Sequence, residues 1–120
     1  MGHGLKHYGV CSEEVKRACP VELALHLIGG KWKGIIIDIL SEKSFRFNEL
    51  KGLIPGISQR ILTLQLRELE SDGIVKRTVS DTVPPRVEYF LTKEGNDLSF
   101  IINSLRVWGQ NYISKSESEY

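Results

Sequence analysis

Apolar side chains recur at steps of three and four residues along most of the chain, the spacing that places them on one face of a helix. The pattern predicts six helices, over residues 12–18, 20–28, 31–42, 47–54, 58–73 and 93–114. The apolar members of these stripes are the expected core positions: Trp32, Ile35, Ile36, Ile39, Leu40, Phe47, Leu50, Leu53, Ile54, Ile61, Leu62, Leu66, Leu69, Leu98, Ile101, Ile102, Leu105, Trp108 and Tyr112.

Residue types that start and stop helices support these boundaries. Pro20 suits a first helical position, and the glycine pair at 29–30 suits the end of the same helix. Ser58 and Thr92 are favourable N-caps, because their hydroxyl oxygens can accept a hydrogen bond from the first turn. Gly73 suits the position just after a helix, where the backbone often turns left-handed.

Two short stretches carry a different pattern. Residues 74–79 and 87–91 are rich in β-branched and aromatic side chains, which favour strands. Residues 80–85, which include two prolines, fit the loop of a hairpin between them. A helix–turn–helix at 45–73 followed by a hairpin at 74–92 and a long last helix predicts a mainly α fold with one small β-hairpin. That is the plan of a winged helix-turn-helix.

The helix that follows Ser58 carries polar residues where a helix–turn–helix protein contacts double-stranded DNA. In this fold the second helix lies in the major groove and reads base edges with its N-terminal residues. Gln59, Thr63 and Arg67 are four residues apart and share a face, which Arg60 borders. Gln suits adenine and Arg suits guanine, while Ser58 leaves the helix N-terminus facing a phosphate. All five are predicted DNA-binding residues.

The hairpin would be the wing of this fold. Lys76, Arg77 and Arg86 place positive charge along it, for contacts with the DNA backbone or a minor groove. Residues 31–60 hold six Lys or Arg and three Asp or Glu, and residues 76–93 hold four and two, although the net charge of the chain is only +1. Two positive zones therefore flank the predicted reading helix, which is compatible with DNA binding.

Length and composition exclude several other classes. The 120 residues suit one domain, with residues 1–10 expected to be flexible. No apolar run approaches the roughly 18 residues of a membrane span, and no export signal is visible, so a cytoplasmic protein is expected. His3 and His7 are a weak metal-binding pair, and Lys31 and Lys33 are expected to be solvated. We find no catalytic set and no cofactor motif, so neither an enzyme nor a cofactor is predicted.

Several stretches together resemble the HxlR family of bacterial winged-helix transcription regulators, which are related to the MarR type. The matching pieces are CPVELALHLIGGKW at 19–32, RFNELKGLIPGISQRILTLQLRELESDGIV at 46–75, VPPRVEYFLTKEG at 83–95, and the spacing from Leu105 to Trp108. They follow the order of the family over about four fifths of the chain. The resemblance implies a DNA-binding regulator, typically a repressor that releases DNA on a chemical signal.

The resemblance also implies a homodimer on a pseudo-palindromic operator, with the N-terminal and C-terminal helices at the dimer interface. The helix at 93–114 would then be the dimerisation helix. Phe100 and Val107 lie off its main stripe, so its apolar surface is wider than one small core needs. Packing in the core of a monomer is the alternative.

Cys19 directly precedes Pro20, and the resemblance to the family makes this cysteine a candidate redox sensor. Some regulators of the family sense oxidants or electrophiles through such a cysteine, and the chemistry needs a thiolate. Members that form an intersubunit disulfide use a second cysteine further along the chain, whereas here the other cysteine is Cys11. The open partners are Cys11 of the same chain or either cysteine of a second subunit. A purely structural role is the alternative for both cysteines.

Two further functions stay open at this stage. A winged helix can be a protein-interaction module, whose affinity for DNA would be weak and independent of sequence. A regulator can also respond to a small-molecule effector without any thiol switch. A regulator should prefer its operator to a scrambled duplex, whereas an interaction module should not. A redox sensor should lose DNA binding on oxidation, whereas a regulator of the small-molecule type should not.

Overall fold

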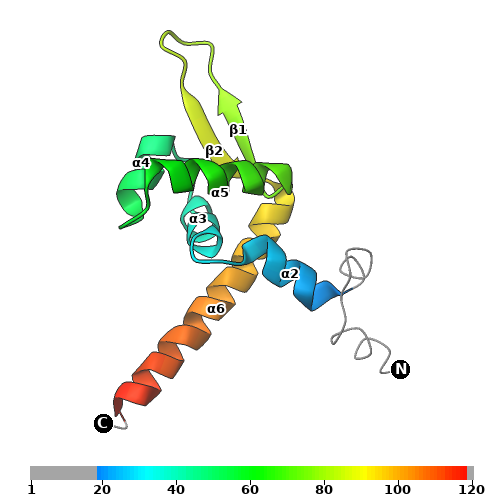
Figure 1. The fold of residues 1–120 in the computed structure, drawn as a ribbon, viewed down its shortest axis with the longest axis vertical. Helices are drawn as coiled ribbons and strands as arrows, with labels where there is room; N and C mark the ends of the chain where they lie inside the picture. Colours follow the sequence, from blue (N-terminus) through cyan, green and yellow to red (C-terminus); the bar gives the residue numbers. More distant parts are fainter. Residues whose placement is uncertain (1–18, 119–120) are drawn as a thin grey trace.

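The computed structural model describes residues 19–118 and confirms the predicted mainly α architecture with one small hairpin. Figure 1 shows a compact upper part, the hairpin rising above it, and one long helix that runs away from it. The short helix expected at 12–18, the start at 1–10, the two histidines within it and Cys11 lie outside the described residues. The elements are α2 (Pro20–Ile28), α3 (Lys33–Leu40), α4 (Phe47–Leu53), α5 (Gln59–Ser71), β1 (Val75–Val79), β2 (Val87–Leu91) and α6 (Lys93–Ser118).

The boundaries of α5 follow from its capping residues. The hydroxyl oxygen of Ser58 accepts a hydrogen bond from the backbone N–H of Ile61 at 3.1 Å. At the other end Gly73 has φ +74°, a left-handed conformation that favours glycine. The N–H of Ile74 then donates to the carbonyl of Leu69 at 2.9 Å. The chain therefore leaves α5 and enters β1 within a few residues.

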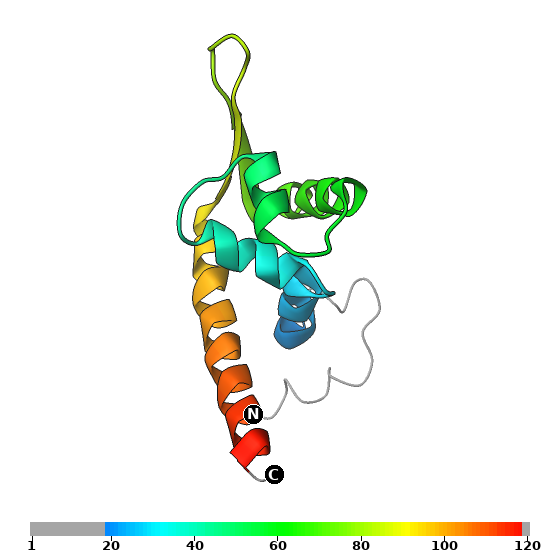
Figure 2. The same ribbon diagram turned by 90° about the vertical axis from the view of Figure 1, so that its left-hand side faces the viewer.

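The hairpin is an antiparallel pair in which Lys76 lies opposite Phe90 and Arg77 lies opposite Tyr89. Backbone hydrogen bonds between Phe45 and Tyr89, at 3.1 and 2.8 Å, join the segment before α4 to β2. The loop between the strands projects beyond the helices (Figure 2). This arrangement is the wing of a winged helix.

The core lies where α3, α4, α5, the base of the hairpin and the first turns of α6 meet. Leu62, Leu66 and Leu69 of α5 point into it and are almost fully buried, as the periodicity predicts. Side chains from every other element in this region join them. The remaining buried members are Ile36, Ile37, Leu40, Phe45, Leu50, Ile54, Ile57, Ile74, Val75, Tyr89, Leu98 and Ile102.

Two predictions of inward side chains on short helices are wrong, and one buried side chain is not among the predicted core positions. Ile35 is exposed and Ile37 is buried in its place, and Leu53 at the end of α4 is also exposed. A helix of seven or eight residues has too few turns for the spacing alone to fix which side meets the core. Lys33, expected in solvent, is only 8% exposed.

The start of α6 is held closely against the base of the hairpin. The Thr92 hydroxyl donates to the carbonyl of Gly73 at 2.6 Å and accepts from the N–H of Gly95 at 3.1 Å, which confirms Thr92 as the cap. A Cβ added at Gly95 would lie 2.2 Å from the carbonyl oxygen of Ile74. Only a glycine allows this close approach, so the last helix starts where the wing ends.

Beyond these first turns, α6 leaves the core. Leu98 and Ile102 are buried, whereas Ile101, Leu105 and Trp108 are exposed within a single chain. Packing of the whole stripe in the core of a monomer, the alternative to a dimer interface, is therefore wrong for its second half. Figure 1 shows this part of α6 extending alone from the body of the molecule.

Candidate nucleic-acid interface

The surface of α5 opposite the core is the candidate DNA-reading face. Arg60, Leu64 and Arg67 are exposed there and follow one another at steps of four and three residues. Leu62, Leu66 and Leu69 occupy the other side of the same helix. The buried leucines therefore fix which residues α5 presents to the outside.

Five residues of α5 line a surface hollow of about 550 Å³. The Thr63 hydroxyl donates to the carbonyl of Gln59 at 2.8 Å, so its proton is used within the helix. Thr63 then offers an acceptor oxygen and a methyl group to a ligand. Four of the five are sequence-predicted site residues, and the full set is Gln59, Arg60, Thr63, Leu64 and Arg67.

The N-terminus of α5 is exposed beside this face. Ser58 satisfies the N–H of Ile61, while the N–H groups of the first residues have no partner within the helix. Such N–H groups and the helix dipole favour a bound anion. A phosphate of a duplex lying along the reading face would meet both.

The structure divides the predicted wing cations between two faces of the hairpin. Arg77 lies on the side of α5, where its Nε is 3.8 Å from Oε1 of Glu70. Arg77 and Arg67 line one hollow of about 490 Å³ between α5 and the wing. Lys76 lies on the opposite face beside Phe90. Arg77 of the wing therefore lies against α5, beside the reading face. Lys76 points to the other side of the hairpin and does not contribute to that face.

Arg86 stands at the start of β2, next to the hairpin loop, and is exposed. Its backbone N–H donates to the Ser80 hydroxyl oxygen at 2.9 Å, which closes the loop across its base. Within residues 19–118, the guanidinium groups of Arg60, Arg67 and Arg86 have no carboxylate partner. Their charges are available to a polyanion.

One ion pair that the sequence does not reveal holds the reading helix in place. The ammonium of Lys33, at the start of α3, lies 2.7 Å from Oε1 of Glu68 on α5. The two residues are far apart in the chain, so no local spacing predicts their contact. A second long-range bond joins the Ser44 hydroxyl to the Glu88 carboxylate at 3.0 Å and ties the loop before α4 to the wing.

Leu64 is the member of the hollow that sequence reasoning missed. The predicted core stripe of this helix is Ile61, Leu62, Leu66 and Leu69, whereas Leu64 is 47% exposed on the opposite side. A signal was present, because Leu64 falls two residues from both Leu62 and Leu66. At about 100° per residue, this spacing places it far from their face.

Cys19 lies at the N-cap of α2 and is 1% exposed. Its carbonyl accepts from the N–H of Leu23 at 2.9 Å, so the cysteine is fixed to the first turn of the helix. The thiol is therefore buried in this conformation. Cys11, the other candidate for redox sensing, lies outside the described residues.

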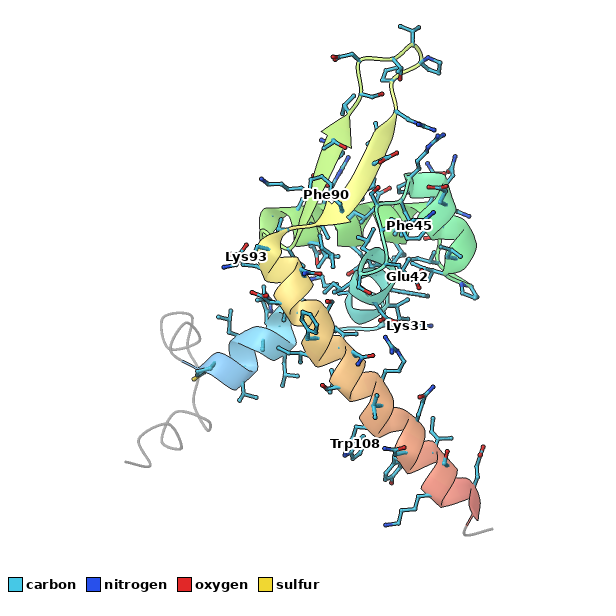
Figure 3. All side chains as sticks on the ribbon, turned by 180° about the vertical axis from the view of Figure 1, so that it is seen from behind. Lys31, Glu42, Phe45, Phe90, Lys93 and Trp108 are labelled. Carbon is cyan, nitrogen blue, oxygen red and sulfur yellow. The ribbon has the colours of Figure 1, made fainter. Side chains whose placement is uncertain are left out.

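The free part of α6 carries a second surface of interest, which we call the α6 apolar face. Figure 3 shows Trp108 projecting from this length of helix, and its ring stacks on that of Tyr112 with centroids 5.2 Å apart. Helix α2 also carries exposed apolar residues, among them Val21 and Leu25. The α6 apolar face consists of Ile101, Leu105, Trp108 and Tyr112, with Phe100, Val107 and Ile113 exposed to either side of it.

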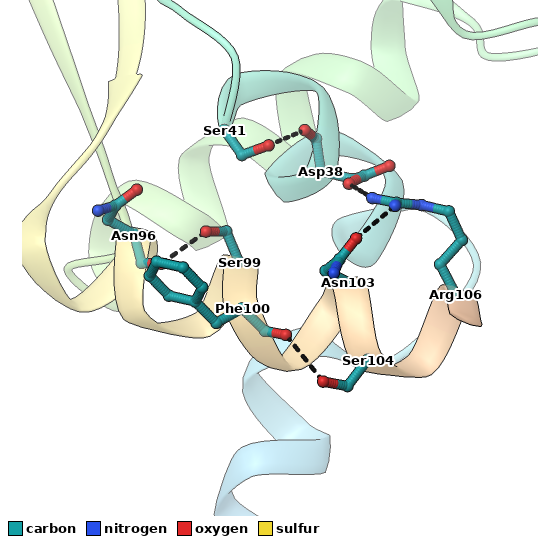
Figure 4. A network of polar contacts seen from close by, with 8 residues as sticks. All are labelled: Asp38, Ser41, Asn96, Ser99, Phe100, Asn103, Ser104 and Arg106. Carbon is teal, nitrogen blue, oxygen red and sulfur yellow. Dashed lines mark hydrogen bonds and ion pairs between the residues drawn. The ribbon is translucent and has the colours of Figure 1, made fainter. Parts of the chain in front are cut away.

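A polar network fixes the direction of α6 relative to α3. The guanidinium of Arg106 contacts the carboxylate of Asp38 on α3 and the amide oxygen of Asn103 on its own helix (Figure 4). Gly34 of α3 faces the same contact, where an added Cβ would lie 3.6 Å from Cδ1 of Ile102, an ordinary packing distance. The apolar face therefore projects at an angle set by α3, the same helix that contacts α5 through Lys33.

Residues 19–118 offer neither a candidate metal site nor a helix that could span a membrane. No group of three His, Cys, Asp or Glu side chains there is placed to hold a metal ion. None of the helices described is long and apolar enough to span a membrane.

Comparison with known proteins supplies independent evidence. The profile of the HxlR-like helix-turn-helix family matches residues 27–117. The HTH-type transcriptional regulator YybR of Bacillus subtilis (strain 168) is 52% identical over 103 residues, which cover 86% of this chain and 82% of YybR. YdeP of the same strain, also an HTH-type transcriptional regulator, is 53% identical over 94 residues, covering 78% and 73%.

Solved structures give the same result. The redox regulator HypR in its reduced form superposes with a TM-score of 0.77 at 50% identity, covering 82% of this chain and 98% of HypR. Diamide-treated YodB from B. subtilis superposes with a TM-score of 0.67 at 32% identity, covering 88% and 97%. The similarity extends over nearly the whole of both proteins.

Proposed function

The chain belongs to the HxlR-like helix-turn-helix family of transcriptional regulators, a family of DNA-binding proteins without enzymatic activity, and we propose that it is a repressor that binds a pseudo-palindromic operator as a homodimer. The observation that carries the proposal is the exposed face of α5. It combines an open helix N-terminus with two arginines that have no carboxylate partner within residues 19–118, on a helix whose orientation is fixed by buried leucines.

We assign the DNA contacts to residues 45–73 and 74–92. Gln59, Arg60 and Arg67 would read base edges in the major groove, since amide and guanidinium groups match adenine and guanine there. The remaining contacts would position the protein on phosphates without reading sequence. The positioning residues are Ser58, Lys76, Arg77 and Arg86, while Thr63 would meet base edges through its methyl group and its acceptor oxygen.

We assign residues 93–114, together with α2, to the dimer interface. Seven apolar side chains exposed along one length of α6 exceed what scattered surface residues explain. A two-fold dimer buries the same patch on both subunits and presents two copies of α5. Two equivalent reading helices imply an operator with two related half-sites. An occupied promoter excludes other proteins from the same DNA, which is sufficient for repression.

We propose Cys19 as the sensor of oxidants or electrophiles, with Cys11 as a candidate partner thiol. The support is the similarity to HypR, a redox regulator with structures in reduced and oxidised forms at 50% and 53% identity. Because Cys19 is buried, we expect its thiol to react more slowly with an oxidant than an exposed thiol would. A change in the position of α2 after oxidation of Cys19 would be transmitted to α3, which packs against α2, and from α3 to α5 through the Lys33–Glu68 ion pair.

The proposal is tested by selecting high-affinity duplexes from a randomised library and measuring their affinity by fluorescence anisotropy. The reduced protein should prefer the selected duplex to a scrambled one by at least about a thousandfold at physiological salt. Diamide should abolish the preference, and a reductant should restore it. A protein without any preference for a selected duplex would contradict the regulator proposal.

Cys19→Ser and Cys11→Ser separate the thiol switch from the DNA contacts. Cys19→Ser should bind the selected duplex like the reduced wild type and should lose its response to diamide. Cys11→Ser retains the response if Cys19 acts alone or pairs with its copy in the second subunit. A Cys19→Ser protein that still responds to diamide would remove Cys19 from the mechanism, and a regulator indifferent to diamide would instead sense a small-molecule effector.

A further inference from the structure

We propose that Leu64 determines part of the operator sequence by contacting the C5-methyl group of a thymine in each half-site. The inference rests on the proposed function, since it needs α5 to lie in a major groove. It specifies one base of the operator, a thymine, and the chemical group of that base that the protein recognises. Among the five residues that line the hollow on α5, only Thr63 and Leu64 carry methyl groups, and Leu64 is the more exposed of the two.

The position of Leu64 on α5 places it next to the residues proposed to read bases. Leu64 lies between Arg60 and Arg67 on the exposed side of α5, about 6 Å along the helix axis from the first and about 4.5 Å from the second. Successive base pairs are about 3.4 Å apart. A base contacted by Leu64 would thus lie within about two base pairs of those contacted by the arginines.

The ordinary reasons for a leucine on a helix do not apply to Leu64. It does not belong to the core, because it is 47% exposed while Leu62 and Leu66 on either side of it are buried. It does not belong to the proposed dimer interface either. Figure 2 shows α5 and the free length of α6 on different sides of the molecule.

Chemistry selects the ligand group. Apolar side chains in a major groove recognise the methyl group of thymine, which no other standard DNA base carries. The neighbouring Thr63 has its hydroxyl proton engaged with the Gln59 carbonyl, so a second methyl group borders Leu64. A small apolar area flanked by two guanidinium groups matches a thymine between guanines or phosphates. It does not match a polar base edge, which would lose hydrogen bonds to water.

The test removes the methyl group from the DNA rather than the side chain from the protein. In the duplex of highest affinity recovered from a randomised library, each thymine is replaced in turn by deoxyuridine, which keeps the base pairing. One thymine in each half-site should matter, with about fourfold weaker binding per methyl group removed, the factor that about 0.8 kcal/mol gives. Substitution in both half-sites should multiply the two losses.

Protein variants identify the side chain responsible. Leu64→Ala should bind the thymine and deoxyuridine duplexes equally, whereas Leu64→Met, which remains apolar and of similar size, should retain the difference. Leu53→Ala is the matched control, because Leu53 is an equally exposed leucine on α4, and it should also retain the difference. Thermal unfolding of each variant confirms that it folds.

The outcomes distinguish the two proposals. Specific binding in which no thymine methyl matters, or in which the methyl effect survives Leu64→Ala, would overturn the role of Leu64 and leave the regulator intact. The absence of any preferred duplex would overturn both. A methyl effect that disappears only on truncation of Leu64 would establish the contact.

Discussion

At the scale of single residues, the exposed arginines differ in what they can meet on a duplex. Arg60 stands on the reading face of α5, close to Leu64, whereas Arg86 stands at the base of the hairpin loop. A guanidinium in a major groove can donate two hydrogen bonds to guanine, while one beside a phosphate binds it whatever the base sequence. Their removal should therefore have different signatures.

Arg60→Ala should weaken binding to the selected duplex by about 1–3 kcal/mol and relax the preference at one base pair in each half-site, because the variant cannot make a bidentate bond to a base. Anisotropy titrations on the selected duplex and its single-base variants measure both effects. Equal weakening on every sequence would mean that Arg60 contacts only the backbone.

Arg86→Ala is the counterpart in the same comparison. It should weaken binding to selected and scrambled duplexes alike and reduce the slope of log K against log salt by about 0.9 for each phosphate that Arg86 neutralises. Titrations at several salt concentrations measure the slope. A change in base preference without a change in slope would contradict a backbone role for Arg86.

At the scale of elements, α3 connects the two working surfaces. It contacts α5 through the Lys33–Glu68 ion pair and α6 through Asp38 and Arg106. The first pair is asymmetric, since the side chain of Lys33 is 10% exposed and that of Glu68 is 45% exposed. If the ion pair is broken, water cannot reach the buried ammonium of Lys33, whereas water can hydrate the exposed carboxylate of Glu68.

Glu68→Gln should therefore lower the free energy of unfolding by about 1–3 kcal/mol, because it leaves a buried ammonium without a counter-charge. Lys33→Met should cost less than about 1 kcal/mol, because Glu68 becomes hydrated and the methionine fills a similar volume. Urea unfolding at one fixed protein concentration measures both variants.

The double variant Lys33→Met with Glu68→Gln is the control for this asymmetry. It should recover most of the stability that Glu68→Gln removes, since no buried charge remains. If Glu68→Gln alone were neutral, the ammonium of Lys33 would have to be hydrated, and the ion pair would not hold α5.

At the scale of the whole molecule, one chain leaves the α6 apolar face uncovered. Trp108 is 66% exposed and stacks on Tyr112, which is also exposed. Such a length of apolar helix is unfavourable in water and favours association. In a two-fold dimer each substitution acts twice.

Trp108→Glu should therefore convert a dimer into a monomer. Two buried aromatic side chains are removed per dimer, at about 1.5–3 kcal/mol each, so the dissociation constant should rise by about a hundredfold or more. Sedimentation velocity at micromolar concentration measures the change. Val83→Glu is the control, because Val83 is 97% exposed at the wing loop, and it should leave the dimer unchanged.

Much of the fold is determined by local sequence. Ser58, Gly73 and Thr92 fix the ends of helices through bonds to backbone groups within a few residues, so the caps could be predicted without any tertiary knowledge. The period of the buried leucines of α5 and the strand-forming residues of the hairpin are equally local. Together they determined the element order, and with it the helix predicted to face DNA.

Tertiary structure alone decided which surfaces meet. The contact of Lys33 with Glu68 and the wrong assignment of Ile35 depend on elements distant in the sequence. Periodicity shows that a face is apolar but does not show what covers it. For this reason the stripe of α6 was identified correctly from the sequence, whereas only the path of the helix away from the core determined that its second half is left exposed in a single chain.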